Sequence, residues 1–254
     1  EQNAIYLLEK GDVVTIEIPD EQEHETLIPV KHPLDIVYED EHFLIINKPS
    51  GFASIPSVLH SNTIANFVKA YYMENDYPNK QVHIVTRLDK DTSGLMLFAK
   101  HGYAHARLDK QLQSKSIEKR YLALVSGKGE LEDSGEIIAP IARSDDSIIT
   151  RRVHPSGKYA HTSYQVVERF GDVALVDIRL HTGRTHQIRV HFAHIGFPLL
   201  GDDMYGGRMD LGVTRQALHC HYLRFRNPYD NKEIIQKIPL TKDFENVIIK
   251  LQKN

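Results

Sequence analysis

An α+β domain on a mainly antiparallel mixed sheet with flanking helices is the fold that the sequence predicts. Three observations lead to it. Short runs of alternating apolar residues, bounded by tight turns, are typical of strands joined by hairpins. Segments with helical periodicity lie between these runs without the regular strand–helix–strand rhythm of a parallel sheet. The chain has 254 residues, 41% of them hydrophobic, which is enough for a sizeable core.

The N-terminal segment differs in character from the rest. Residues 13–18 alternate as Val-Val-Thr-Ile-Glu-Ile and predict one strand, after which the chain becomes strongly acidic. The sequence starts abruptly at Glu1, without an initiator Met, so we expect this strand to be left from a module upstream.

Two strands and a helix are predicted next. Residues 36–38 and 43–46 are short β runs around an acidic turn, and the second run ends at Pro49-Ser50-Gly51. Residues 62–75 place Ile64, Phe67, Val68 and Tyr71 at i, i+3, i+4 and i+7, which predicts an amphipathic helix.

The second half continues the mixed pattern. Residues 105–125 begin as a helix and pass at Lys119-Arg120 into a strand over 121–125. Residues 172–180 alternate cleanly, and residues 215–228 are typical of a strand up to Pro228.

Composition and charge limit the classes of function. No apolar run approaches the roughly 20 residues of a membrane-spanning helix, and no signal-peptide pattern is present. One cysteine, Cys220, makes no internal disulfide and no cysteine-based zinc site, so we expect a reducing cytoplasm. Residues 1–50 hold 12 acidic and 3 basic residues, whereas the other 204 carry a net charge of +6. This asymmetry is a mild indication of a polyanionic partner.

The junction at residues 85–100, VTRLDKDTSGLMLFAK, contains the first candidate site. Charged residues stand directly before a run that is apolar from Leu95 to Ala99, as expected of a loop and strand that deliver a carboxylate to a cleft. Ser93 lacks the glycine elbow of a hydrolase nucleophile. Asp89 and Asp91 could serve as the acid and base of a glycosidase, or could simply pair with Arg87 and Lys90 on the surface.

The segment 180–196 contains the second candidate site. The strand that ends near residue 180 leads to a Thr182-Gly183 turn, and Thr185 is positioned to cap a following helix. Free backbone N–H groups and Arg184 would then converge into a site for an anion or a carboxylate. The alternative is an ordinary strand–helix junction with a surface arginine.

Four histidines lie in or beside this segment, but they do not form a metal motif. The pattern contains no His-Glu-x-x-His and no cysteine pair, and only His191 and His194 share a helical face. We expect no metal here.

Six segments together resemble the motifs of the RluA-type pseudouridine synthases, in the order in which that family has them. They run from about residue 34 to residue 240 and read VYEDEHFLIINKPSG, RLDKDTSGLMLFAK, EKRYLALVSG, GKYAHTSYQVVERF, LHTGRTHQIRVHFAHIGFPLLGDDMYG and RQALHCHYLRFRNP.

This resemblance implies a pseudouridine synthase fold with a central catalytic cleft, and a role for particular residues. Asp89 would be the catalytic carboxylate, Arg184 the cation paired with it, and Tyr121 the ring that stacks on the uracil base, with a hydroxyl that is a candidate for moving a ribose proton. Arg87 would help to hold the space that the base vacates. The expected RNA-binding residues are Arg87, Lys90, Arg151, Arg152, Lys158, His186 and Arg189.

The resemblance also implies an organisation and a function. Residues 1–32 would be the remnant of an N-terminal RNA-binding module with an acidic linker, and residues 33–254 the catalytic domain. The expected activity is isomerisation of uridines in structured RNA, ribosomal rather than transfer RNA, by a monomer that needs no cofactor or metal. The alternatives are a non-catalytic RNA-binding or ribosome-assembly factor on the same fold and, less favoured, a glycoside hydrolase that uses Asp89 and Asp91.

Overall fold

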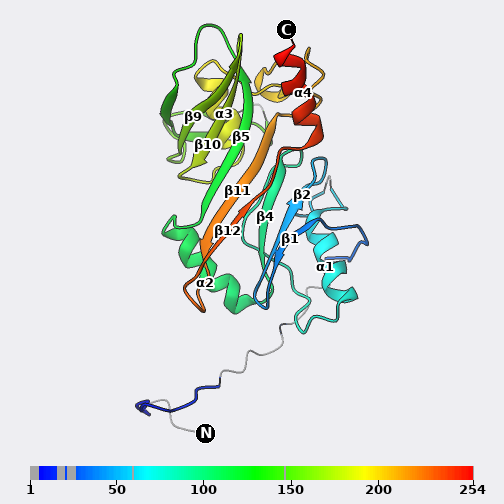
Figure 1. Cartoon of the computed structure of the whole chain (residues 1–254), viewed down its shortest axis with the longest axis vertical. Coiled ribbons are helices and arrows are strands. Elements are labelled where there is room, and N and C mark those ends of the chain that lie inside the picture. The colour runs from blue at the N-terminus through cyan, green and yellow to red at the C-terminus, as the bar shows by residue number, and fades with distance from the viewer. Residues whose placement is uncertain (1–5, 16–20, 22–26, 59, 146, 254) are drawn as a thin grey trace.

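The computed structural model describes residues 6–15, 21, 27–58, 60–145 and 147–253 (Figure 1). Within this part of the chain, ten strands form one long mixed sheet in the order β1-β2-β4-β11-β5-β10-β9-β6, with β12 added to β11 and β3 to β4. The strands are β1 Ile36–Glu39, β2 Phe43–Lys48, β3 His83–Ile84, β4 Ser93–Ala99, β5 Glu118–Ser126, β6 Ser134–Ile138, β9 His161–Phe170, β10 Val173–Leu180, β11 Leu218–Arg226 and β12 Glu233–Lys237. A separate hairpin consists of β7, Ile141–Arg143, and β8, Arg151–Val153.

The predicted sheet type is confirmed. Every described pair of strands in it is antiparallel except β4 with β11, which run parallel. That pair joins the half of the sheet built from the first 100 residues to the half built from β5, β9 and β10 (Figure 1).

A glycine permits the close approach of β4 and β11. Gly94 has φ +119, and a Cβ atom added to it would lie 2.3 Å from the carbonyl oxygen of Cys220. Any other residue would therefore push the two strands apart and would also strain the backbone. Because β4 directly follows the loop that carries Asp89, this contact fixes the end of that loop.

Four α-helices flank the sheet in the described chain: α1 Ile64–Glu74, α2 Gly102–Gln113, α3 Gln187–His194 and α4 Lys242–Gln252. Helix α1 begins where the backbone N–H of Thr63 donates to Asn66 Oδ1 at 2.9 Å. It buries Ile64, Phe67, Val68 and Tyr72 against β2 and β4. Helices α2 and α4 lie at opposite ends of the sheet (Figure 1).

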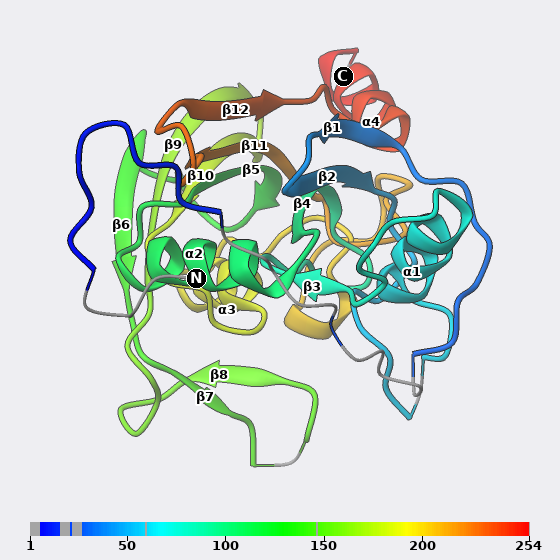
Figure 2. The same ribbon diagram turned by 90° about the horizontal axis from the view of Figure 1, so that it is seen from below.

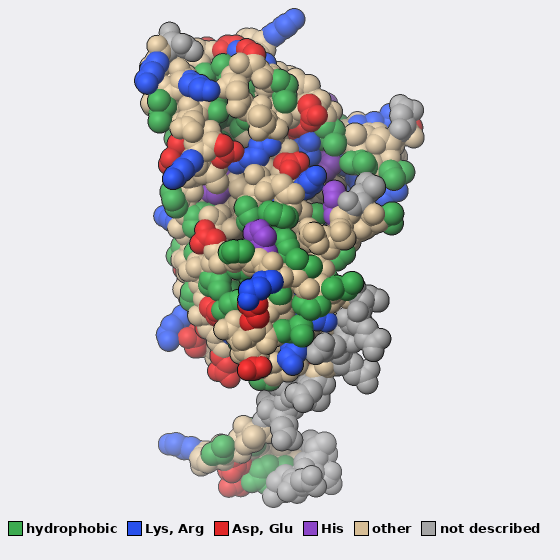
Figure 3. All heavy atoms as spheres, turned by 90° about the vertical axis from the view of Figure 1, so that its right-hand side faces the viewer, with side chains coloured by type: hydrophobic (Ala, Val, Ile, Leu, Met, Phe, Trp, Pro, Cys, Tyr) green, Lys and Arg blue, Asp and Glu red, His purple; other side chains and the backbone are tan. Residues whose placement is uncertain are grey.

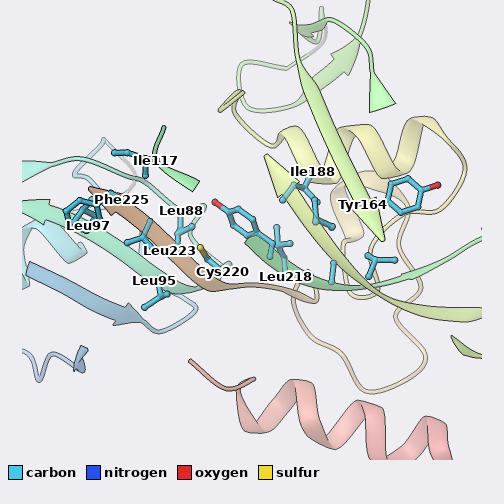
Figure 4. Close-up of a cluster of buried hydrophobic side chains, with 14 of the residues drawn as sticks. Leu88, Leu95, Leu97, Ile117, Tyr164, Ile188, Leu218, Cys220, Leu223 and Phe225 are labelled. Atoms are coloured by element: carbon cyan, nitrogen blue, oxygen red, sulfur yellow. The ribbon is translucent and has the colours of Figure 1, made fainter. Parts of the chain in front are cut away.

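The largest hydrophobic cluster connects the two halves. Figure 4 shows Leu95 and Leu97 of β4, Cys220 and Leu223 of β11, and Ile188 of α3 within it. Of these, Leu95, Leu97, Cys220 and Leu223 are fully buried. At about 25 cal/mol per Å² of buried apolar surface, such a continuous core is the main stabilisation of the domain. It also fixes α3 relative to the loop of Asp89.

Two local predictions differ from the structure. Val13, Val14 and Thr15 are not in a strand, because no described strand pairs with them and an isolated strand leaves its backbone groups unpaired; residues 16–18 of that predicted strand lie outside the described residues. Thr185 is exposed and does not cap α3. The N-cap is His186, which has a left-handed backbone with φ +57. The boundary at residue 32 stays a prediction.

Candidate active site

Asp89 lies in the short loop between β3 and β4, and the side chains of the buried Lys48 and the half-buried Arg215 hold the backbone of that loop. The Nζ atom of Lys48 donates to the carbonyl oxygens of Pro49, Lys90 and Thr92, each at 2.8 Å. The guanidinium of Arg215 donates to the carbonyl of Asp91 at 3.0 Å. With its carbonyls occupied in this way, the loop presents the Asp89 side chain from a rigid mount.

Burial lowers the pKa of Lys48 to about 7, and the carboxylates of Asp91 and Asp89 oppose this shift. The three carbonyl acceptors also favour the ammonium form, because each accepts one of its three N–H bonds. Lys48 is thus a fully buried amine under the candidate site, and its charge changes with pH close to neutrality.

The cation beside Asp89 is Arg189 of α3. Its Nη1 atom lies 3.7 Å from Asp89 Oδ2. Asp202 holds the same guanidinium from the other side, with Oδ2 2.7 Å from Nε and Oδ1 2.8 Å from Nη2. Arg189 is 5% exposed and Asp202 is fully buried. Such a bidentate pair fixes the plane of the guanidinium, so the remaining nitrogen is directed at Asp89.

The predicted pairing of Asp89 with Arg184 is therefore wrong. Arg184 lies in the turn before α3, its side chain is exposed, and its Nε atom donates to the carbonyl of Tyr159 at 2.9 Å. No described carboxylate lies within ion-pair distance of it. Arg189 lies inside the helix and faces the core side, where Asp202 can reach it.

Tyr121 lies on β5 and is almost fully buried in the largest hydrophobic cluster. Burial raises the pKa of its hydroxyl well above the ordinary value, and the neighbouring Cys220 and Asp89 raise it further. The hydroxyl therefore keeps its proton at neutral pH beside the Asp89 carboxylate. The structure thus brings Asp89, Tyr121 and Arg189 together from three separate parts of the chain.

The predicted RNA-binding residues occupy two regions apart from Arg189. Arg87 and Lys90 flank Asp89 and are exposed. Arg151 and Arg152 belong to the β7–β8 hairpin, which stands out from the body of the domain (Figure 2), and Lys158 bridges to β7 beside it.

The two hairpin arginines already have partners. Arg151 Nη1 donates to the carbonyls of Ile148, Ile149 and Thr150 in the hairpin turn, and Arg152 Nη2 lies 2.5 Å from Asp145 Oδ2. Figure 3 shows histidine and basic side chains close together at the base of a projecting part of one face. Arg152 is exposed and Arg151 is half-buried on this protruding element.

The histidines of this region have structural partners. His186 is half-buried, with Nδ1 2.8 Å from the hydroxyl of Tyr205. His191 is fully buried between Thr162 Oγ1 and the carbonyl of Ala139, both at 2.9 Å. Across the described ranges, no group of three or more His, Cys, Asp or Glu side chains is arranged to hold a metal ion. None of the helices in those ranges is long and apolar enough to cross a membrane.

Four residues of the site had no role assigned from the sequence: Lys48, Asp202, Tyr205 and Arg215. The segments that resemble the family contain all of them, but nothing in a local pattern says that Asp202 reaches Arg189 or that Arg215 reaches residue 91. These contacts depend on the tertiary fold.

Comparisons with known proteins point to one family. Residues 42–194 match the model of the RNA pseudouridylate synthase family. The chain is 44% identical over 246 residues to the uncharacterized RNA pseudouridine synthase YjbO of Bacillus subtilis, with 96% of this chain and 85% of that protein covered. It is 39% identical to ribosomal large subunit pseudouridine synthase D of Pseudomonas aeruginosa, with 83% and 69% covered.

The fold has counterparts among solved structures. Human RNA Pseudouridylate Synthase Domain Containing 4 superimposes with a TM-score of 0.71 at 22% identity, covering 85% of this chain and 92% of that one. The sequence matches, together with a sheet of the expected kind, lead to one conclusion: the chain belongs to the RluA family of RNA pseudouridine synthases, and it is an RNA-modifying isomerase.

Proposed function

We propose that this enzyme modifies ribosomal RNA, that Asp89 is its catalytic carboxylate, and that Arg189 rather than Arg184 is the cation that serves Asp89. The observation that carries the catalytic assignment is the approach of Arg189 Nη1 to Asp89 Oδ2 at 3.7 Å, with Asp202 fixing the arginine from behind. The substrate assignment is supported by relatives at 38–39% identity whose names specify the large ribosomal subunit.

The reaction needs few groups. The bond between uracil N1 and ribose C1′ breaks, the base turns, a bond from C5 to C1′ forms, and the proton on C5 is lost while N1 gains one. Atoms and electrons balance without a redox step. A carboxylate facing the sugar acts as a nucleophile or stabilises an electron-poor sugar, and a neighbouring cation balances its charge.

Tyr121 suits two tasks in this scheme. Its ring comes from a rigid strand and would stack on the base once the side chains that cover it, at 3% exposure, give way to the RNA. Its hydroxyl is protonated at neutral pH, as in any tyrosine with an ordinary or raised pKa, and it is the candidate group for moving a proton of the ribose or of the base.

In our proposal, cations at the surface recognise the RNA. A uridine in structured RNA must leave its stack, at a cost of a few kcal/mol. Arg87 and Lys90 flank Asp89 and suit the space that the base vacates, while Arg151, Arg152 and Lys158 suit the phosphate backbone. Arg184, exposed and without a described ion-pair partner, joins this phosphate-contacting group in our proposal.

Mapping of pseudouridine tests the proposal. We expect RNA from cells that lack the protein to lose pseudouridine at one or more positions of large-subunit ribosomal RNA, and wild-type protein, but not Asp89→Asn, to restore it. Loss confined to transfer RNA would refute the substrate assignment alone. Restoration of the modification by Asp89→Asn would refute the catalytic assignment.

A further inference from the structure

Tyr205 was not among the predicted site residues, but it contacts three of them, Arg189, Arg151 and His186. Tyr205 ends the short 3₁₀ turn η1, Asp203–Tyr205, which directly follows Asp202. The turn places the Tyr205 ring centroid 4.9 Å from the guanidinium carbon of Arg189. One short segment therefore supplies both the carboxylate that clamps Arg189 and the aromatic ring that packs against it.

The Tyr205 hydroxyl lies between two other groups. It accepts a hydrogen bond from the backbone N–H of Arg151 in β8, at 3.0 Å, and lies 2.8 Å from Nδ1 of His186. Because the Arg151 N–H can only donate, the hydroxyl proton is free to go to His186 Nδ1. This arrangement requires a neutral His186 ring with its own proton on Nε2.

His186 has an unusual backbone conformation. Its φ of +57 is uncommon for a residue with a Cβ atom and costs on the order of 1 kcal/mol or more. The conformation ends the turn at residue 185 and begins α3, the helix that carries Arg189. The hydrogen bond from Tyr205 therefore holds the residue at which α3 starts.

From these contacts we propose that Tyr205 is a positioning residue for the isomerisation: through its ring it orients Arg189, and through its hydroxyl it holds His186 neutral at the start of α3. This inference rests on the proposed roles of Asp89 and Arg189 but adds a residue whose described contacts are with Arg189, His186 and Arg151 and not with Asp89.

The charges around His186 set the direction of its pH response. Burial is the largest cause that lowers the pKa of His186. The carboxylates of Asp89, in the β3–β4 loop, and Asp202, before η1, raise this pKa. The positive charges of Arg189, in α3, and Arg151, in β8, lower it further. Protonation at Nδ1 would reverse the hydrogen bond with Tyr205 and leave the phenolic proton without this acceptor. Loss of the Tyr205 hydroxyl should therefore raise the pKa of His186.

Tyr205→Phe tests the proposal, because it keeps the ring against Arg189 and removes only the hydroxyl. The substrate is total RNA from cells lacking the protein, which contains the unmodified target whatever its class. We expect the single-turnover rate at saturating enzyme to fall at least about fivefold, the acid limb of its pH profile to move to higher pH, and RNA affinity to stay within about twofold of wild type. Tyr71→Phe is the matched control, since it loses a hydroxyl bonded to Glu39 at 2.8 Å, away from the site.

A second variant keeps the proposal falsifiable if Tyr205→Phe folds poorly. His186→Asn tolerates the left-handed backbone but cannot take up a proton, so its acid limb should lie at lower pH than that of wild type. The double variant should be no slower than the slower single variant, because the two residues act as one unit. A wild-type rate and pH profile in Tyr205→Phe, a loss of RNA affinity alone, or an unchanged acid limb in His186→Asn would overturn the proposal. Activity in Asp89→Asn would instead count against the role of Asp89.

Discussion

Asp89 and Arg189, one hundred residues apart in the chain, approach to 3.7 Å because the β3–β4 loop and helix α3 pack on the same core. Their environments differ. Arg189 is buried and held by Asp202, whereas the Asp89 side chain is 28% exposed. The pair thus combines a fixed cation with a carboxylate that a substrate can reach.

Asp89→Asn should abolish isomerisation and leave RNA binding intact. The substitution keeps the size of the side chain and removes the charge that the reaction needs at the sugar. Single-turnover conversion and filter binding, measured on the same RNA, check this. Asp91→Asn, two residues on in the same loop, is the matched control and should keep most of its activity. Appreciable turnover by Asp89→Asn would show that another group does the chemistry.

Arg189→Lys should lower the single-turnover rate at least about tenfold, or roughly 1.4 kcal/mol of barrier. Lysine keeps the charge but carries its donors on one nitrogen, so it lacks the planar fork whose Nε and Nη2 meet both oxygens of Asp202 while Nη1 faces Asp89. Arg184→Lys is the control, because that side chain is exposed and bonded only to a backbone carbonyl among the described residues. A larger loss of rate for Arg184→Lys than for Arg189→Lys would reverse the assignment.

This reassignment shows where sequence reasoning reached its limit. Both arginines follow the same glycine turn, and the position of Thr185 suggested a helix start that would favour Arg184. The helix instead starts at Gln187 after a left-handed His186, and the partner that selects Arg189 is Asp202, thirteen residues further on. A local pattern does not contain that long-range contact.

The fold, like the site, could be predicted only where the signal lies in the local sequence. Strands β1, β2, β4, β5, β10 and β11 and helix α1 could be identified from alternation and helical periodicity, because these are local signals, whereas β3, β6, β9 and β12 were not predicted. The parallel pairing of β4 with β11 could not, since it joins residues about 125 apart and depends on the absence of a side chain at Gly94. The β7–β8 hairpin was also missed as an element: its strands are only three residues long.

Tyr121→Phe should separate the ring from the hydroxyl. The phenylalanine ring fills the same place on β5, so RNA affinity should be nearly unchanged. The rate should fall if the buried, protonated hydroxyl moves a proton during the reaction. Single-turnover kinetics beside binding measurements decide this, with Tyr164→Phe, a buried tyrosine of the same core, as the control. Equal rates for wild type and Tyr121→Phe would leave the ring as the only contribution of this residue.

The double variant Arg151→Ala, Arg152→Ala should weaken RNA binding across sequences and flatten its salt dependence. Each phosphate contact that is lost should reduce the slope of log K against log salt by about 0.7 to 0.9. The rate at saturating enzyme should change little, because uniform binding does not lower the barrier. Arg208→Ala with Arg226→Ala removes the same charge from other exposed sites that pair with local carboxylates. If both double variants had the same slope, the hairpin would not lie on the RNA path.

Acid should destabilise the fold through His219, which is fully buried on β11. Its Nδ1 lies 2.9 Å from Ser93 Oγ, and its Nε2 lies 3.0 Å from the carbonyl of Pro239. Arg215 donates to the same Ser93 oxygen at 3.2 Å, so the serine proton is directed to Nδ1 and the neutral ring satisfies every partner. Burial lowers the pKa of His219 to about 4 from 6.5, with a smaller contribution from the charge of Arg215.

Between these two values the unfolded chain binds a proton that the folded chain does not, so stability falls as the pH falls through the window from 6.5 to about 4. The full loss would be on the order of 3 kcal/mol. Urea unfolding at pH 7 and pH 4 should show this loss in wild type and a clearly smaller one in His219→Gln, whose amide can accept from Ser93 and donate to Pro239 without titrating. His194→Gln, at an exposed histidine, should behave like wild type. An equal acid loss in wild type and His219→Gln would mean that other groups, above all the paired carboxylates, cause the acid sensitivity.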